Sequence, residues 1–191
     1  MRASEIATEW LGPRTEAEIR QSLQREVGQQ RLTGLDRALL RQAVADTVDL
    51  TGHPEDRQRQ NLLRARLQRL EAMALAERVD ANRWRLAPDM ASTLTAMGER
   101  EDALDTMRRA LKGQQRECLL DGASITPVIG RIAAKGLADE LHDRGYLVVD
   151  GIDGRAHYLK LPSGADLSAL PVGSIVEARP PGRERTVDRT I

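Results

Sequence analysis

Cysteine and aromatic residues are almost missing from this sequence. The single cysteine, Cys118, excludes an internal disulfide and a zinc cluster made of cysteines. Phenylalanine is absent and aromatic residues make up only 2% of the chain, so its cores must be built from Leu, Val, Ile and Ala. Proteins that bind single-stranded nucleic acid usually stack bases on several aromatic side chains. A base-stacking platform is therefore disfavoured, because the chain offers only Trp10, Trp84, Tyr146 and Tyr158.

Long apolar runs, targeting signals and catalytic motifs are also missing. No run approaches the ~18 apolar residues of a membrane span, and no signal peptide opens the chain, so we expect a cytoplasmic protein. The three histidines form no His-x-His pair, and no Gly-rich loop carries a lysine that could cradle phosphate. The sequence therefore predicts no metal site, no cofactor and no catalysis.

The adjacent residues His157 and Tyr158 come nearest to a nucleophile with its base. Successive side chains of a strand point to opposite faces of a sheet, so these two groups would not act together. We expect Tyr146 and Tyr158 to be core or surface residues of strands. The other histidines, His53 and His142, are expected in a turn and on the surface.

Positive charge is concentrated in one segment, although the whole chain has a net charge of zero. Residues 57–87 hold eight arginines against three acidic residues. Such a concentration would attract a nucleic-acid phosphate backbone. The chain also has 26 arginines and only three lysines. This bias can place arginine on solvated surfaces without a function, which is the alternative interpretation of the segment.

The segment begins with an amphipathic helix, expected from residue 57 to about residue 75. At about 100° per residue, one apolar face would pack on a core, and it consists of Leu63, Leu67, Leu70 and Ala74. The opposite face carries side chains of the types that contact bases, namely Arg57, Gln58, Asn61, Arg64, Ala65 and Gln68. Arg66 and Arg69 lie at the flanks of that face, where phosphate contacts are expected.

A short hairpin follows this helix at once. Strands are predicted at 76–79 and 83–86, and the three-residue loop 80–82 is an ordinary hairpin connection. Trp84 should point inward and Arg83 and Arg85 outward. A helix followed directly by a hairpin is the order of elements in the DNA-binding part of a winged helix. Winged helices also bind proteins. The predicted DNA-binding residues are Arg57, Gln58, Asn61, Arg64, Gln68, Arg69, Arg83 and Arg85.

Helices are expected on both sides of this segment. Capping-box patterns at Thr15 with Glu18 and at Thr33 with Asp36 predict helices over 15–27 and 33–45. The second helix would have a buried stripe made of Leu35, Leu39, Leu40 and Ala43. A short helix is expected over 4–11 and a small strand over 48–50. Gly98 should divide the region after the hairpin into two helices, 89–97 and 99–112.

Beyond residue 126 the pattern changes to β. Strands are predicted at 128–134, 145–150, 155–161 and 174–179, with a helical turn over 137–144 and a Gly-rich hairpin turn at 151–154. Short strands with Gly-rich turns suggest a small barrel or a fragment of a barrel. The expected fold class is α+β, with an N-terminal α-rich winged-helix domain followed by a small antiparallel β-barrel-like domain.

The predicted organisation has six parts, since the length favours two small domains over one large one. These parts are N-terminal helices that pack on the next domain (1–32), the winged helix (33–87), a helical extension (88–115), a linker (116–126), the small β domain (127–180) and a tail (181–191). The tail has no apolar periodicity, and we expect it to be cut from a longer chain.

Several segments resemble the C-terminal region of bacterial relaxases from plasmids and conjugative elements. The resembling segments are RLTGLDRALLRQ (31–42), RLEAMALAERVDANRWRLAPD (69–89), LTAMGERED (94–102), TMRRAL (106–111) and GRIAAKGLADELHDRGYLVVDGIDGRAHYLKLP (130–162). The resemblance runs from about residue 31 to residue 177 and is most specific over 130–158. In that family, which includes the nickase of plant-tumour T-DNA transfer, the region follows a nicking domain and is itself a domain of unknown function.

The resemblance implies processing of DNA for conjugation and transfer through a type IV secretion channel. It does not supply the nuclease, because a relaxase needs a nucleophilic tyrosine near its N-terminus and a histidine cluster that holds a metal. Three alternative functions remain. The first is a DNA-binding module for duplex or hairpin DNA near the transfer origin. The second is a protein-interaction module, or translocation signal, for the type IV coupling ATPase or relaxosome proteins. The third and weakest is a winged-helix transcription regulator, which would need a symmetric dimer on a palindrome.

Overall fold

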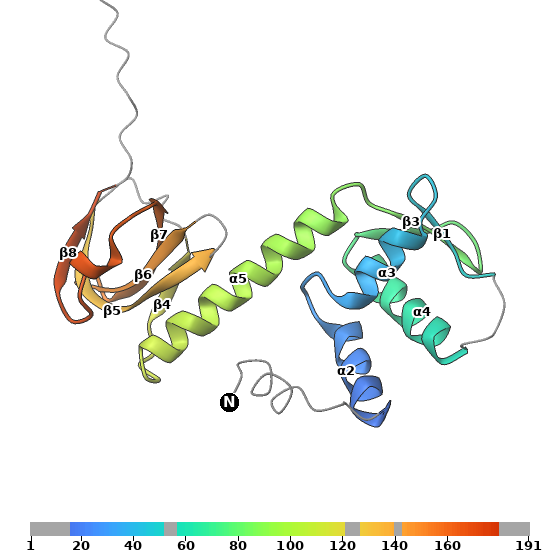
Figure 1. The fold of residues 1–191 in the computed structure, drawn as a ribbon, viewed down its shortest axis with the longest axis horizontal. Coiled ribbons are helices and arrows are strands. Elements are labelled where there is room, and N and C mark those ends of the chain that lie inside the picture. The colour runs from blue at the N-terminus through green and yellow to red at the C-terminus, as the bar shows by residue number, and fades with distance from the viewer. Residues whose placement is uncertain (1–15, 52–56, 121–126, 140–142, 180–191) are drawn as a thin grey trace, which may run out of the picture. The chain divides into compact units, whose positions relative to one another are not determined.

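A computed structural model of the protein describes residues 16–51, 57–120, 127–139 and 143–179 (Figure 1). These residues form four α-helices and two β-sheets, which confirms the α+β class. The chain divides into two compact units, Met1–Gly98 and Glu99–Ile191. The helix expected over 4–11, the cap at Thr15 and the turn at His53 lie outside the described residues.

The helices of the first unit are α2 (Glu16–Gly28), α3 (Gly34–Gln42) and α4 (Arg57–Ala72). The predicted capping box at the start of α3 is confirmed. The Asp36 backbone N–H donates to the Thr33 hydroxyl, and the Thr33 N–H donates to the Asp36 carboxylate at 2.8 Å. Helix α3 ends three residues earlier than predicted, because Ala43 is extended and both Ala45 and Asp46 have positive φ in a tight turn.

The predicted hairpin after α4 is confirmed. Strands β2 (Ala76–Arg78) and β3 (Arg83–Leu86) pair antiparallel, and β1 (Thr47–Asp49) pairs antiparallel with the other edge of β3, giving the order β1-β3-β2. The Trp84 side chain points inward and is fully buried, as the alternation predicted. The first-unit core joins this sheet to the helices through Leu39, Leu63, Leu67, Leu70, Trp84 and Met90.

Two predicted core positions of this unit are wrong. Leu40 is 40% exposed, because the buried stripe of α3 is narrower than its apolar sequence. Ala74 is also exposed, because α4 ends at Ala72 and Ala74 has a φ of +59° in the turn that leads to β2. Helix α4 therefore packs on the core through the three predicted leucines, and the predicted alanine does not take part.

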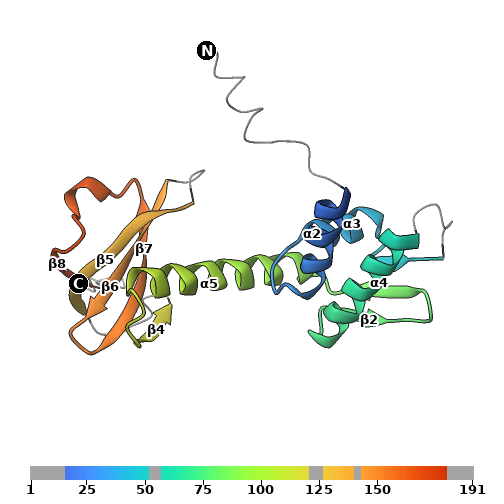
Figure 2. The same cartoon turned by 90° about the horizontal axis from the view of Figure 1, so that it is seen from below.

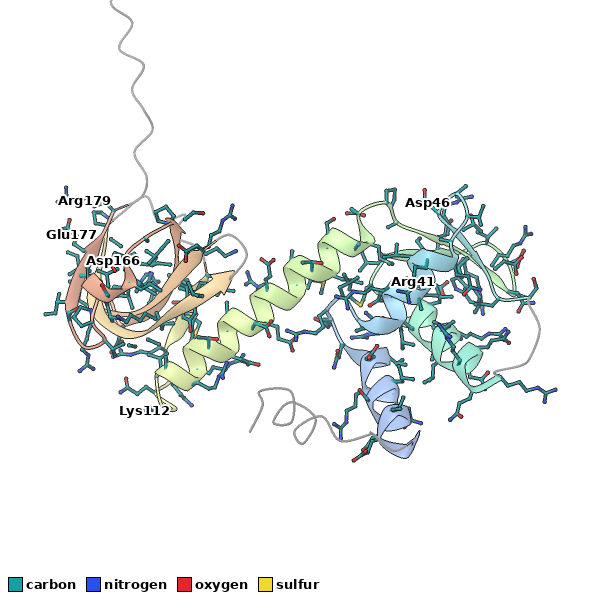
Figure 3. All side chains as sticks on the ribbon, viewed as in Figure 1. Arg41, Asp46, Lys112, Asp166, Glu177 and Arg179 are labelled. Atoms are coloured by element: carbon teal, nitrogen blue, oxygen red, sulfur yellow. The ribbon has the colours of Figure 1, made fainter. Side chains whose placement is uncertain are left out.

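The predicted helix break at Gly98 is wrong, since α5 (Met90–Ala110) is a single helix. Gly98 serves close packing: a Cβ atom placed on it would lie 2.9 Å from the Cβ of Arg31, whose guanidinium donates to the Gly98 carbonyl at 3.2 Å. The helix ends at Ala110, and the turn after it contains Lys112 (labelled in Figure 3). Lys112 and Gly113 both take positive φ in this turn. Glycine here allows a neighbour to approach and does not interrupt the helix.

The second unit contains an open five-stranded sheet (Figure 2). Its strands are β4 (Glu117–Leu120), β5 (Val128–Asp139), β6 (Arg144–Gly151), β7 (Arg155–Ser163) and β8 (Ile175–Ala178). The order is β4-β7-β6-β5-β8, and β4 runs parallel to β7 while the other pairs are antiparallel. The sheet does not form a closed barrel, because β4 and β8 stand at opposite edges and no strand pair among the described residues closes it.

Two segments of this unit differ from the sequence-based expectation. Residues 117–120, expected within a linker, form β4. The helical turn expected over 137–144 is contradicted at both ends, because β5 continues to Asp139 and β6 begins at Arg144; residues 140–142 lie outside the described residues. Register shifts within β5 let this long strand stay paired with β6. The predicted hairpin of β6 and β7 around the Gly151–Gly154 turn is confirmed.

Residues on the two faces of this sheet form separate cores. On one face, Val148, Ala156 and Tyr158 pack with Ala103, Met107 and Leu111 of the C-terminal part of α5 and its end. On the other face, Ile132, Val149 and Leu159 pack with residues around the 3-10 turn η2 (Leu167–Ala169) and β8. Each face of the sheet is covered, one by α5 and the other by residues around η2 and β8. Strands buried on both faces have continuous apolar runs in their sequence.

Candidate nucleic-acid interface

Helix α4 has one buried face and one exposed polar face. Leu63, Leu67 and Leu70 are buried, as predicted. The exposed face carries a row at spacings of four, three and four residues, which places its members within one narrow stripe of a helix. We call this row the α4 stripe, and it consists of Arg57, Asn61, Arg64 and Gln68. Gln58, Arg69, Arg83 and Arg85 are exposed as well, so all eight predicted residues reach the surface of the first unit.

Arg66 contradicts the prediction of a phosphate contact at the flank of the helix. Its side chain is fully buried and forms an ion pair with the equally buried Asp36, with Nε and Nη2 each 2.8 Å from a carboxylate oxygen. The remaining guanidinium N–H groups donate to the carbonyl oxygens of Glu26, Val27, Gln29 and Arg31, at 2.6–3.2 Å. Arg66 thus satisfies carbonyls at the C-terminal end of α2.

The sequence contains a signal that identifies Arg66 as buried. The residue lies three positions after Leu63 and four before Leu70. On a helix this spacing places it on the same face as both leucines. A charged residue on an apolar face is buried only with a partner, and the partner here is the capping residue Asp36.

The α4 stripe is connected to the hairpin loop by one hydrogen bond. Arg64 Nη2 donates to the side-chain oxygen of Asn82 at 2.9 Å. The Asn82 backbone N–H donates to Asp80, and its carbonyl accepts from the N–H of Leu50. The loop 80–82 therefore links α4, the hairpin and the segment that follows β1.

The arginines of the hairpin are paired with neighbouring acids or with an aromatic ring. Arg83 contacts Asp80, and Arg85 Nη1 lies 3.7 Å from a Glu77 carboxylate oxygen. Hydrogen bonds from the Asn82 backbone N–H and from Arg83 lower the pKa of Asp80 below its ordinary value. Arg78 lies over the Trp84 ring at 5.1 Å, a cation–π distance.

Part of the positive charge on the exposed face of α4 is not paired with a carboxylate among the described residues. Neither Arg57 nor Arg69 has a carboxylate partner within the described part of the chain, and Arg64 bonds to a neutral amide. Exposed guanidinium groups at helical spacing can contact the phosphates and base edges of a duplex. The first unit thus presents a basic helix face with a hairpin tied to it.

Other sequence-based candidates have structural roles. His157 Nε2 lies 3.0 and 3.2 Å from the carboxylate oxygens of Asp153, and Tyr158 stacks on Tyr146 with ring centroids 5.1 Å apart. Both tyrosines are strand residues, as predicted. His142 lies outside the described residues.

No described helix has both the length and the apolar character that crossing a bilayer requires. In the same residues, His, Cys, Asp and Glu form no group of three or more that could hold a metal ion.

Comparison with known families identifies the chain as a member of the DUF3363 family, a family described as a protein of unknown function. The match covers residues 63–191, which is more than half of the chain. It begins within α4 and includes the hairpin and the whole second unit. No curated protein and no solved structure matches the chain.

Proposed function

We propose that this chain is a non-catalytic C-terminal region of a plasmid or conjugative-element relaxase. In this role it binds DNA through a winged helix and assists transfer-origin processing and conjugative DNA transfer. The observation that carries the DNA-binding proposal is the exposed α4 stripe, flanked by Arg69 and tied to the hairpin through Arg64 and Asn82. The relaxase context rests on the sequence resemblance alone.

The winged-helix assignment is supported by the order of elements in the first unit. Helix α4 directly precedes the β2–β3 hairpin, and β1 completes an antiparallel sheet in the order β1-β3-β2. In the proposed complex, α4 lies in the major groove and the hairpin lies against the adjacent backbone. Arg64, Asn61 and Gln68 would contact base edges. Phosphate contacts would come from Arg57, Arg69, Arg83 and Arg85.

Duplex DNA, or the duplex stem of a hairpin, suits this surface better than a single strand. Trp84 is fully buried, and the stacked Tyr146 and Tyr158 belong to the other unit. Within the described part of the first unit, no aromatic side chain is therefore presented beside the α4 stripe. Without stacking, binding must come from phosphate contacts and groove contacts, which depend strongly on salt.

The test is fluorescence anisotropy with duplex, hairpin and single-stranded oligonucleotides at several salt concentrations. We expect duplex binding that weakens with salt, and a triple variant R57A/R64A/R69A should bind weakly to every sequence. Each phosphate contact that is lost should reduce the slope of log affinity against log salt by about one. The matched control is R100A/R108A/R131A, which removes three exposed arginines at other positions. Equal binding by both triple variants would sink the proposal.

A second candidate function, docking of a relaxosome protein or the type IV coupling ATPase, is favoured by exposed apolar residues of the second unit. Ile152 is 80% exposed and Ile175 78% exposed. Ile129 accepts a hydrogen bond from the Ile152 N–H, and Ile175 lies on β8 at the edge of the sheet. Strongly exposed apolar residues in a turn and on an edge strand can serve as protein contacts. Binding to the ATPase without DNA, lost in I152D/I175D, would support this candidate, and a variant that binds as well as the wild type would exclude it.

A further inference from the structure

A pocket of about 310 Å³ lies in the second unit, between the C-terminal part of α5 and the sheet. Its volume falls at the lower end of the range for small-molecule sites. We call it the tyrosine pocket, because Tyr146 and Tyr158 line it together with four charged residues, Glu99, Asp102, Arg144 and Lys160. None of these residues contributes to the DNA-binding proposal.

The two tyrosine rings stack on each other, with centroids 5.1 Å apart and planes inclined by only 14°. Tyr146 also lies over Gly136 of the neighbouring strand. A Cβ atom placed on Gly136 would be 2.8–3.0 Å from the Cε1, Oη and Cζ atoms of the ring. Glycine at 136 and the stack with Tyr158 therefore fix the Tyr146 ring in place. The Tyr146 hydroxyl has no hydrogen-bond partner among the described residues.

Charges of both signs line the pocket, and they come from different elements. Glu99 and Asp102 lie on α5, three residues apart, and Arg144 and Lys160 lie on β6 and β7. Lys160 Nζ is 3.6 Å from a Glu99 carboxylate oxygen, and both side chains are more than half exposed. A ligand with only negative charge would be repelled by the two carboxylates, and a ligand with only positive charge would be repelled by the two basic groups.

We propose that the tyrosine pocket binds a small zwitterion of amino-acid size. The cationic group of the ligand lies toward the carboxylates of Glu99 and Asp102. Its carboxylate lies toward Arg144 and Lys160, and the Tyr146 hydroxyl bonds to the polar part between them. Complementary charge is the main source of specificity in such a site. The stack holds both rings in one orientation at the pocket wall.

The test compares three probes of similar length by isothermal titration calorimetry with the full chain. These probes are 4-guanidinobutyrate, which is a zwitterion, agmatine, which has two cationic groups, and glutarate, which has two carboxylates. We expect 4-guanidinobutyrate to bind at least about tenfold more tightly than either other probe. Absence of binding by all three at about 10 mM, or equal binding by all three, would overturn the proposal.

Two charge variants and one matched control locate the binding. D102N and R144Q should each weaken 4-guanidinobutyrate binding by roughly tenfold, since each removes one half of the complementary charge. D105N is the control, because Asp105 lies one turn along the same helix, is 55% exposed and pairs with Arg108. Agmatine affinity should fall in D102N and not in R144Q. Binding that D102N and D105N reduce equally would place the probe elsewhere and refute the site.

Discussion

Arg66 and Asp36 form a buried ion pair that joins three segments of the first unit. The pair connects α4 to the start of α3, and the same guanidinium bonds to carbonyls at the end of α2. We predict that R66A lowers the free energy of unfolding by about 3–5 kcal/mol, because it leaves a buried carboxylate without its partner. Urea denaturation followed by circular dichroism measures the change. The exposed neighbour Arg69 is the control, and R69A should change the stability by less than about 0.5 kcal/mol; equal losses in the two variants would contradict the assignment.

The ionisation of Asp153 makes the stability of the folded protein depend on pH. Burial raises the pKa of its carboxyl group, but hydrogen bonds from the Arg155 backbone N–H and from His157 outweigh this effect, so the pKa is lowered overall. A lowered pKa in the folded state gives stability that is present above the unfolded pKa, near 4, and is lost as the pH falls through the folded pKa. We therefore expect the stability difference between wild type and D153N to shrink below about pH 4. Urea midpoints of both proteins from pH 2.5 to 6 test it, and a constant difference would count against the prediction.

Residue-level prediction from the sequence succeeded where one helix or strand decides the outcome. The inward Trp84 and the buried Leu63 and Leu67 follow from periodicity within one element. The prediction that Leu40 is buried is wrong, because the exposure of this side chain depends on what packs against α3. The role of Arg66 depends on a partner thirty residues away, so it requires the tertiary structure.

At the scale of elements, the hairpin limits its own positive charge. Glu77 lies beside Arg85 on the paired strands and is 76% exposed. We predict that E77Q raises affinity for duplex DNA, roughly two- to fivefold at low salt, because it removes a negative charge next to a phosphate-binding arginine. Anisotropy titrations at low and high salt measure the gain, which should disappear at high salt. E117Q makes the same charge change on β4 and should leave the affinity unchanged. A gain of the same size in E117Q would show a general charge effect.

The elements that the sequence predicted well have local signals. The α3 cap, the β2–β3 hairpin and the β6–β7 hairpin each follow from a few adjacent residues. Strand β4 could not be predicted in this way, because it pairs in parallel with β7 about forty residues later. The continuity of α5 through Gly98 depends on the approach of Arg31, which no local pattern reveals.

At the scale of the whole molecule, the proposed functions are assigned to different units. The α4 stripe and the hairpin lie within Met1–Gly98, and the tyrosine pocket and the exposed isoleucines lie within Glu99–Ile191. Each unit has apolar clusters of its own. A chain with separate cores can divide its functions between units.

This division predicts how fragments will behave. A fragment of residues 1–112, which keeps α5 whole, should bind duplex DNA within about threefold of the full chain, because every proposed DNA contact is retained. A fragment of residues 99–191 should not bind DNA and should keep 4-guanidinobutyrate binding, since all residues of the tyrosine pocket are present. Anisotropy and calorimetry on both fragments, after circular dichroism has shown that each is folded, make the comparison. DNA binding that needs residues 113–191 would mean that the second unit contributes contacts, and the α4 stripe would then be only part of the interface.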